Sequence, residues 1–333
     1  MGIANLIKSR LGGEFYRKLK NLGKAQKIIA STPPPFSDKD KWGYYFIKGY
    51  VDVSVRFMRL AYIFGGNRVR QSKMCYLPED YVINELKKKF PSPSGTLYLG
   101  DFKIPDPSED AIAKHLFEME FNDLFVSYFI DNSSVLSLIT WEGPYESGSV
   151  ELKEGDVVID CGANMGYFSA VASAKKCSVY AFEPISVVVE KYLSKTIALN
   201  SNITICNYAL SDFEGTLEFA PGNDLLNMGA YSAYSDDMKN KNDVITLPCT
   251  TIDTFVDNFK LEKLDFIKAD IEGAERYMLR GAVNTMKRFA PKLSICTYHL
   301  PDDPEVIRSI ITQANPAYVI EEKYQKLYAY VQK

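Results

Sequence analysis

The C-terminal half of this 333-residue chain has the pattern that most constrains its fold. From about residue 143, short apolar runs alternate with longer segments of helical spacing. An apolar run that hardly alternates, such as residues 156–162, is typical of a strand buried on both faces. Strands separated by helices form βαβ units, in which the strands are parallel. The sequence therefore predicts an α/β domain with a doubly wound, mostly parallel sheet.

The strand-like runs of this half also predict the composition of the sheet. Two runs near the end of the chain, 317–322 and 326–332, are a few residues apart and predict an antiparallel hairpin. With five parallel strands they make a seven-stranded core, unlike the repeated halves of a dinucleotide-binding fold. The helix after the fourth strand is expected to end at Gly281. The five parallel strands are expected at 156–162, 178–184, 203–210, 264–270 and 292–299.

The chain is long for one compact domain, and we divide it into three parts. Residues 1–35 are expected to form a basic amphipathic helical arm, residues 36–140 a mainly helical N-terminal accessory domain, and residues 141–333 the α/β domain. Within the accessory domain, a helix is expected to start near Ser108, which would cap it. The first 140 residues carry no motif that indicates a function.

The arm combines an apolar stripe with a strong positive charge. Residues 3–29 contain seven basic residues and one acidic residue, a local charge of +6. A basic amphipathic helix can lie on an anionic membrane surface. Alternatively, the helix packs on its own domain and keeps a charged face in solvent. The sequence leaves both interpretations open.

Composition limits the classes of partner. An apolar content of 46% is typical of a soluble protein with a sizeable core, and a formal net charge of −3 gives no indication of nucleic-acid binding. The chain has no apolar run long enough to span a membrane, and its six cysteines include no CxxC pair. With no secretory signal, we expect reduced thiols and a cytoplasmic protein. The basic arm is the part of the chain that could make peripheral contact with a membrane.

The turn after the first strand is the strongest indication of a ligand. It runs from Asp160 through Gly162 to Gly166, and its glycines let the backbone turn sharply and approach a ligand. In such sheets, ligands bind beyond the carboxyl ends of the strands, where the strand order reverses. Asp160 can anchor an ammonium group, and the helix N-terminus favours a carboxylate. Glu183 ends the second strand, where an acid meets ribose hydroxyls.

Together these groups indicate S-adenosylmethionine rather than NAD as the ligand. A ribose, an ammonium group and a carboxylate are all parts of that molecule, and an acid in the turn would repel the pyrophosphate of a dinucleotide. The alternative is an ordinary strand–turn–helix with a capping aspartate and no ligand.

Several motifs give a resemblance to a known family. They include "VVIDCGANMGYFS", "AFEP", "NYALSDFEGTLEF", "LDFIKADIEGAERYMLRGA" and "SICTYH". From about residue 142 to the C-terminus, the chain resembles the FkbM family of S-adenosylmethionine-dependent methyltransferases. The resemblance implies a class I methyltransferase fold and O-methylation of a hydroxyl on a sugar, glycan or lipid-linked intermediate. Together with the turn, it indicates cofactor contacts from Asp160, Gly162, Ala163, Asn164, Gly166, Glu183, Asn207, Ala209 and Asp270.

The chemistry is expected at the end of the fourth strand. Lys268, Asp270 and Glu272 would face the transferred methyl group, and His299 ends the fifth strand. A hydroxyl acceptor must be aligned and must lose a proton. The candidate catalytic residues are therefore Lys268 and the three candidate bases Asp270, Glu272 and His299.

Each of these residues also has a structural interpretation. Asp270 can cap the next helix, and Glu272 and Glu275 can favour its dipole. Lys268 can be an ion-pair partner, and His299 can be a hydrogen-bonded structural residue.

The fifth strand departs from the family pattern, because Thr297 and Tyr298 rather than an acid precede His299. No metal is expected, since no spacing of histidines and acids indicates one and methyl transfer to a hydroxyl does not require one. The loop around Asn227, Gly229 and Ser232 is a candidate cover for the cofactor or a mobile surface loop.

Three other functions stay open at this point. One is an N-methyltransferase acting on a protein or small amine, and another is a non-catalytic module that binds S-adenosylmethionine or associates with membranes. The third is a nicotinamide-dependent dehydrogenase. The sequence sets neither the oligomeric state nor the acceptor.

Overall fold

The computed structural model describes residues 13–31, 49, 51–52, 54, 79–99, 101–120, 124, 143–221, 231–232 and 244–332. The chain divides into two compact units, Met1–Pro91 with Phe117–Pro144, and Ser92–Leu116 with Tyr145–Lys333. The proposed boundaries at residues 35 and 140 stay predictions. The stripe before residue 13 and the loop positions Asn227 and Gly229 lie outside the described residues.

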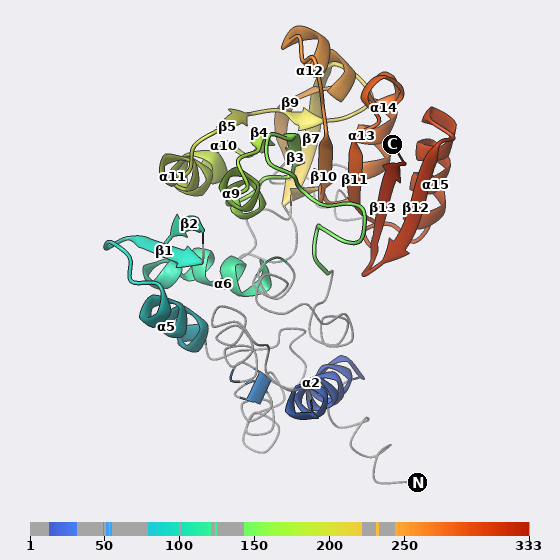
Figure 1. Ribbon diagram of the computed structural model, residues 1–333. Coiled ribbons are helices and arrows are strands. Elements are labelled where there is room, and N and C mark those ends of the chain that lie inside the picture. Colours follow the sequence, from blue (N-terminus) through green and yellow to red (C-terminus); the bar gives the residue numbers. More distant parts are fainter. Residues whose placement is uncertain are drawn as a thin grey trace. The chain divides into compact units, whose positions relative to one another are not determined.

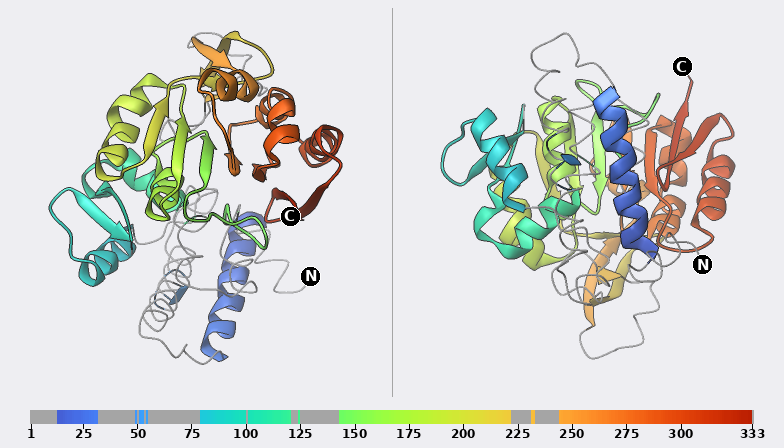
Figure 2. Two further views of the ribbon diagram at one scale, coloured as in Figure 1. Left: turned by 45° about the horizontal axis from the view of Figure 1, so that its top comes forward. Right: turned by 90° about the horizontal axis from the view of Figure 1, so that it is seen from below.

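The N-terminal unit contains the helices α2 (Gly13–Ser31) and α5 (Glu79–Lys89), and α2 is one continuous helix in Figure 2. On α2, Leu22, Ala25 and Ile29 are buried, whereas several basic side chains of the same helix are exposed. This arrangement fits a helix that packs within the protein, and contact of the arm with a membrane stays a prediction. Among the described residues, none of the helices combines the length and apolar character that a membrane crossing requires.

The C-terminal unit begins with a small hairpin and the first residues of a helix that Asp110 caps. The elements are β1 (Thr96–Leu99), β2 (Phe102–Pro105), the 3₁₀ turn η1 (Pro107–Glu109) and α6 (Ala111–Glu120). The predicted cap is wrong, because Ser108 lies inside η1. Asp110 caps α6 instead: its Oδ1 accepts hydrogen bonds from the amides of Ile112 (2.9 Å) and Ala113 (3.0 Å). An aspartate at this position satisfies amides that have no partner within the helix.

A seven-stranded sheet forms the centre of this unit, as predicted. In Figure 1 its strands run from right to left as β12 (Tyr318–Lys323), β13 (Lys326–Val331), β11 (Lys292–Cys296), β10 (Phe266–Ala269), β3 (Val157–Cys161), β4 (Ser178–Phe182) and β5 (Ile203–Cys206). β13 runs opposite to the other six strands of the sheet, which are parallel to one another. This order confirms the doubly wound class I methyltransferase fold.

The order of the strands places the ligand turn at the centre. The chain passes outward from β3 through β4 to β5, then returns to β10 and β11 on the other side of β3. The strand order therefore reverses between β3 and β10, and ligands of open α/β sheets bind beyond the carboxyl ends of the strands at such a point.

Helices cover both faces of the sheet. One face packs against α12 (Ile252–Asn258), α13 (Glu275–Arg280), α14 (Val283–Phe289) and α15 (Asp303–Ala314). Toward the other face lie α9 (Tyr167–Ala174), the short α10 (Ser186–Val188), the π-helical turn η3 (Val189–Leu193) and α11 (Ser194–Leu199). The larger core includes Ile159, Ile267 and Ile295 from three neighbouring strands, all fully buried.

The hairpin at the end of the chain has a tight turn. Lys323 pairs with Lys326, so the two residues Tyr324 and Gln325 connect β12 to β13. Both connecting residues have left-handed φ values, 55° and 60°, as a type I′ turn requires. The carbonyl of Gln325 accepts hydrogen bonds from the amide (3.0 Å) and hydroxyl (2.9 Å) of Thr297. The turn is thereby tied to the end of β11.

The expected third strand, 203–210, is wrong in its second half. The strand β5 ends at Cys206, and the amide of Tyr208 turns back to donate to the Cys206 carbonyl (2.9 Å). The chain then joins a second sheet, in which β6 pairs with β9. That sheet has the order β6 (Ala209–Leu210), β9 (Ile245–Thr250), β7 (Gly215–Pro221) and β8 (Tyr231–Ser232).

Gly281 ends α13 as predicted, but for a different reason. Its φ is −75°, so it does not adopt the left-handed conformation of a helix-terminating glycine. A Cβ at this position would instead lie 2.1 Å from the carbonyl oxygen of Ser211. Only glycine allows this close approach of two backbones.

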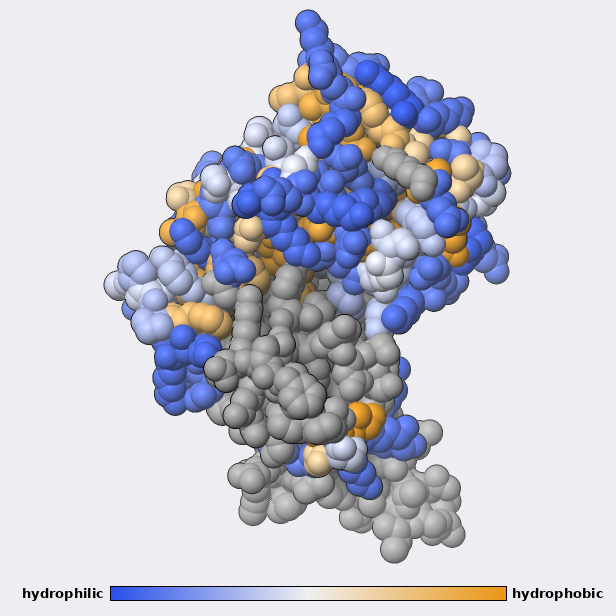
Figure 3. Space-filling model, viewed as in Figure 1, coloured by the Kyte–Doolittle hydropathy of each residue, from blue (hydrophilic) through white to orange (hydrophobic). Residues whose placement is uncertain are grey.

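The described residues on the face drawn in Figure 3 are mostly hydrophilic, with apolar residues in small groups. Every cysteine that the structure describes is a buried free thiol, as expected for a protein with reduced cysteines.

Candidate functional site

The turn between β3 and α9 is shaped by two glycines in the left-handed region. Gly162 has a φ of 77°, and a Cβ there would lie 2.1 Å from the Asp270 carbonyl oxygen. Gly166 has a φ of 79°, and a Cβ there would lie 2.7 Å from Leu193 Cδ1. Gly162 is therefore required where this turn packs against the end of β10, and Gly166 where it packs against a helix. Their approach to a ligand stays a prediction.

Asp160 and Lys268 form a buried ion pair beneath this turn. Lys268 Nζ lies 3.1 Å from Asp160 Oδ1, and both side chains are at most 5% exposed. The same ammonium donates to the carbonyls of Gly162 (2.7 Å) and Cys161 (3.3 Å), and Ser169 donates to Asp160 Oδ2 (2.7 Å). Of the two predicted roles of Lys268, the geometry supports that of ion-pair partner. The Asp160 carboxylate holds the turn from inside, and its contact with a ligand's ammonium group stays a prediction.

Glu183 follows β4 and connects two turns. Its carboxylate accepts hydrogen bonds from the amides of Asn164 (3.0 Å) and Ile185 (3.0 Å). Asn207, after β5, donates from its side chain to the Glu183 carbonyl (2.8 Å). Burial raises the pKa of Glu183 to about 7, although the two amides and Lys268 lower it. This acid lies where ribose recognition was predicted, at the carboxyl end of the second strand.

Two predicted cofactor residues contribute through packing and backbone. Ala163 is buried beside Leu193, and its amide donates to the Phe182 carbonyl (2.8 Å). Ala209 lies in β6, and its side chain packs in the core of the second sheet with Phe219 and Cys249. Their contacts with a cofactor stay predictions.

Asp270 lies directly after β10 and is held by two phenols. Tyr145 donates to its Oδ2 (2.7 Å) and Tyr298 donates to its Oδ1 (3.0 Å). Burial raises the pKa of Asp270, but the positive charges of His299, Lys268 and Lys326 lower it by more, to about 2. Asp270 is therefore ionised and a weak base, and the interpretation of this residue as the proton acceptor is not supported.

Glu272 and Glu275 lie three residues apart in the chain but have different environments. Glu275 is fully buried, and its carboxylate accepts hydrogen bonds from the amides of Ile271 (2.8 Å) and Gly273 (3.0 Å). These bonds tie Glu275 to the residues just before α13, and its interaction with the helix dipole stays a prediction. Glu272 has a left-handed φ of 55° and a side chain that is 35% exposed. Burial raises the pKa of Glu272 to about 7, partly offset by His299.

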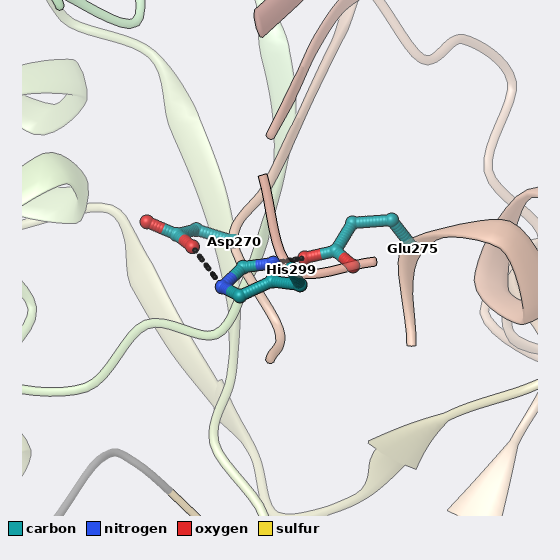
Figure 4. A group of neighbouring side chains, drawn as sticks. All are labelled: Asp270, Glu275 and His299. Atoms are coloured by element: carbon teal, nitrogen blue, oxygen red, sulfur yellow. Dashed lines mark ion pairs between the residues drawn. The ribbon is translucent and has the colours of Figure 1, made fainter. Parts of the chain in front are cut away.

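His299 lies between carboxylates that converge from both sides (Figure 4). Its Nδ1 is 3.0 Å from Glu275 Oε1, and its Nε2 is 3.6 Å from Asp270 Oδ1 and 3.5 Å from Glu272 Oε2. Burial lowers the pKa of His299, but Glu275, Asp270 and Glu272 raise it by more, to about 10. At neutral pH the imidazole already carries a proton, so His299 does not fit the role of base.

The same side chains raise the question of a metal. Asp270, Glu275 and His299 offer ligand atoms that lie within 4.8 Å of one another. However, the imidazole separates the two carboxylates and turns one ring nitrogen toward each (Figure 4). A shared ion would take one atom from each of these residues, whereas here each ring nitrogen faces its own carboxylate, and the expected absence of a metal stays a prediction. The geometry suits an imidazolium paired with carboxylates.

A comparison with known families fits this arrangement of turn and strand ends. Residues 160–321 match the model of the methyltransferase FkbM domain. The chain contains an FkbM methyltransferase domain. The match covers the turn, Glu183, Asp270, Glu272 and His299, and it bears out the resemblance found in the motifs.

Three similar proteins share little sequence identity with this chain. The hexuronic acid methyltransferase AglP of Haloferax volcanii is 24% identical over 164 residues, which are 49% of this chain and 64% of AglP. The crystal structure of a methyltransferase FkbM from Methylobacillus flagellatus KT is 15% identical, covers 96% of this chain and 60% of its own, and has a TM-score of 0.40. The crystal structure of a precorrin-6y C5,15-methyltransferase from Geobacter metallireducens GS-15 is 12% identical. It covers 54% of this chain and 80% of its own, with a TM-score of 0.31. This chain thus spans less than two thirds of the length of AglP. The assignment of the fold rests on the order of the strands in the sheet.

Two residues that contact the site lie outside the residues that match the FkbM domain. Tyr145 precedes the sheet, and Lys326 is the first residue of β13. Because β13 is antiparallel, its first residue lies at the carboxyl ends of the other strands, opposite Cys296. Neither residue was predicted from the sequence. A lysine that opens an otherwise apolar run was the available signal for Lys326, and Tyr145 had none beyond its place at the start of the resemblance.

Proposed function

We propose that this protein is an S-adenosylmethionine-dependent methyltransferase that methylates a hydroxyl group on a sugar, glycan or lipid-linked intermediate. The FkbM domain and the class I fold support the reaction class. One observation carries the assignment to a hydroxyl. Glu272, a 35% exposed acid whose pKa is raised to about 7, directly follows Asp270 and Ile271, the two residues that the turn after β3 approaches at Gly162.

The residues around the turn fit the proposed cofactor. The nucleoside would lie between the glycine turn and Glu183, whose carboxylate can accept hydrogen bonds from ribose hydroxyls in addition to the two amides. When bound, S-adenosylmethionine supplies a methyl group activated by a sulfonium. The protein must then align the acceptor and remove its proton.

Glu272 is the acid best suited to take that proton. The acceptor oxygen forms a bond to the methyl carbon, the bond from carbon to sulfur breaks, and the hydroxyl proton passes to the Glu272 carboxylate. A base with a pKa near the working pH serves this role best. Asp270 stays ionised, and the protonated His299 offsets the charge of the surrounding carboxylates.

The acceptor is expected to be a carbohydrate. AglP bears the name hexuronic acid methyltransferase, and this supports a uronic acid as the first probe. Glucuronic and galacturonic acid should be compared with glucose and galactose, with isotope-labelled S-adenosylmethionine as donor. Mass spectrometry and NMR would locate the methyl group. A methyl on the carboxylate rather than a hydroxyl would remove the need for a base and overturn the role of Glu272.

The matched variants are Glu272→Gln and Glu262→Gln, since Glu262 is exposed on the same unit. Loss of transfer only in Glu272→Gln supports the proposed base. If wild type transfers no methyl to these probes or to any component of a cell extract, yet binds S-adenosylhomocysteine, the protein is a non-catalytic binding module. A labelled methyl group on the nitrogen of an amine in the extract would show that the protein is an N-methyltransferase.

A further inference from the structure

Two buried ammonium groups lie close to the ring of Tyr145. Lys268 Nζ is 5.1 Å from the centre of its ring, and Lys326 Nζ is 4.6 Å from it. Tyr145 is 3% exposed and Lys326 is 0% exposed. A buried ammonium is costly unless its surroundings compensate the charge, and the face of an aromatic ring attracts a cation. The ring is therefore one of the groups that hold these two charges in place.

The same tyrosine connects the two halves of the site. Its hydroxyl donates to Asp270 at the end of β10. One of the ammonium groups on its ring belongs to Lys268, which bonds to the Gly162 carbonyl in the turn after β3. A path of direct contacts thus leads from the turn through Lys268 and Tyr145 to Asp270.

The segment that carries Tyr145 is itself anchored. The ring packs edge-on against Phe168 of α9, at 5.4 Å between ring centres. The neighbouring Glu146 carboxylate accepts hydrogen bonds from the Leu152 amide and from Lys175 (each 2.7 Å). Tyr145 therefore has a defined position from which it can orient other side chains.

We infer that Tyr145 is a positioning residue that aligns the cofactor turn with the acceptor side of the site. The inference rests on the proposed function. The ring holds Lys268, and with it the turn, whereas the hydroxyl holds Asp270. Methyl transfer needs donor and acceptor in line at short distance, so loss of either contact slows it.

The experiment separates ring from hydroxyl. Tyr145→Leu removes both, and Tyr145→Phe removes only the hydroxyl. Tyr298 is the matched control, because it also donates to Asp270 but its ring lies against His299 rather than Lys268. Affinity for S-adenosylhomocysteine is measured by calorimetry, and turnover is measured on the hexuronic acid that wild type methylates.

We expect Tyr145→Leu to weaken binding of S-adenosylhomocysteine by about tenfold, and Tyr298→Leu to change it less than about twofold. We expect Tyr145→Phe to lower kcat by about tenfold with an unchanged KM for S-adenosylmethionine. A residue that only fills space would not separate kcat from KM in this way. If Tyr145→Leu is unfolded by circular dichroism, Tyr145→Phe decides alone.

Unchanged kcat in Tyr145→Phe, or equal loss of affinity in the two leucine variants, overturns the inference while leaving the proposed function intact. If wild type fails to bind S-adenosylhomocysteine, the proposed function fails with it.

Discussion

The two halves of the site are built in different ways. The turn after β3 is formed by consecutive residues, and backbone geometry determines it: two left-handed glycines, and amides that bond to Glu183. The cluster around His299 is formed by side chains from the ends of β10 and β11 and the start of α13, and charge determines it. A region of the first kind should be more sensitive to changes of shape than to changes of charge, and a region of the second kind should be more sensitive to changes of charge.

Gly162→Val should have the largest effect, because it changes shape in the turn. A side chain there would collide with the Asp270 carbonyl in a conformation that β-branched residues avoid, so we expect no measurable binding of S-adenosylhomocysteine. Gly155→Ala is the control, since Gly155 is also left-handed (φ 82°) but has open space around its Cβ position. Its cost should stay near 1–2 kcal/mol of unfolding free energy by thermal denaturation. If both variants lost binding of S-adenosylhomocysteine to the same extent, the close approach of Gly162 to Asp270 would not explain the effect.

Glu272→Gln should be the most damaging change of charge for activity. We expect kcat to fall by about 100-fold, because the variant cannot accept a proton, while cofactor affinity stays the same. In wild type, activity should fall as the pH drops below about 7, since protonation of Glu272 removes the base. A pH–rate profile of wild type and variant checks this. An unaltered acid limb in Glu272→Gln would assign that limb to another group.

The charge of His299 should make stability depend on pH. Its folded pKa is raised above the ordinary value, so its contribution is complete below about 6.5 and is lost as pH rises through about 10. We expect the free energy of unfolding to fall between pH 7 and 10, by at most about 1.4 kcal/mol per pH unit for this one group. Urea denaturation of wild type and His299→Gln would test it. The variant should have a flatter dependence, and parallel curves would contradict the assignment.

Glu183 should give the smallest effect, because it bonds mainly to backbone. Ribose hydroxyls bind best to the ionised acid, so affinity for S-adenosylhomocysteine should rise severalfold from pH 6 to pH 8 as Glu183 loses its proton. Glu183→Gln should remove that pH dependence and weaken binding by about tenfold at pH 8. Calorimetry at both pH values checks this, and a variant that keeps the dependence would exclude Glu183 as its source.

The same contrast explains what could be predicted from the sequence. The turn and Glu183 were located correctly, because glycine spacing and the ends of apolar runs are local properties. The positions of Asp270, Glu272 and His299 were also found, since each follows a strand of the predicted sheet. Their protonation was not predictable, because it depends on neighbours from distant parts of the chain. Tyr145 and Lys326 contribute to the state of Asp270 from outside the matched domain.

The errors have equally local causes. The third strand was predicted to continue through Asn207 and Tyr208, because the residues on both sides of them are apolar. Instead, the amide of Tyr208 bonds back to the Cys206 carbonyl, and the chain turns into the second sheet. Gly281 was expected to end a helix by its flexibility, but the carbonyl of Ser211, seventy residues earlier in the chain, is what excludes a side chain there. Contacts between segments that are distant in the chain cannot be recognised from the spacing of apolar residues in the sequence.

The terminal hairpin has a consequence for how this protein tolerates change. Its two-residue turn uses Tyr324 and Gln325 in a backbone conformation that asparagine and glycine adopt more easily. A slip of one residue in pairing would move Lys326 to the opposite face of the sheet and withdraw its charge from Asp270. The register of this edge hairpin thus sets how near the charge of Lys326 lies to Asp270. An insertion or deletion in that turn would change the electrostatic environment of Asp270 without replacing any residue that contacts it.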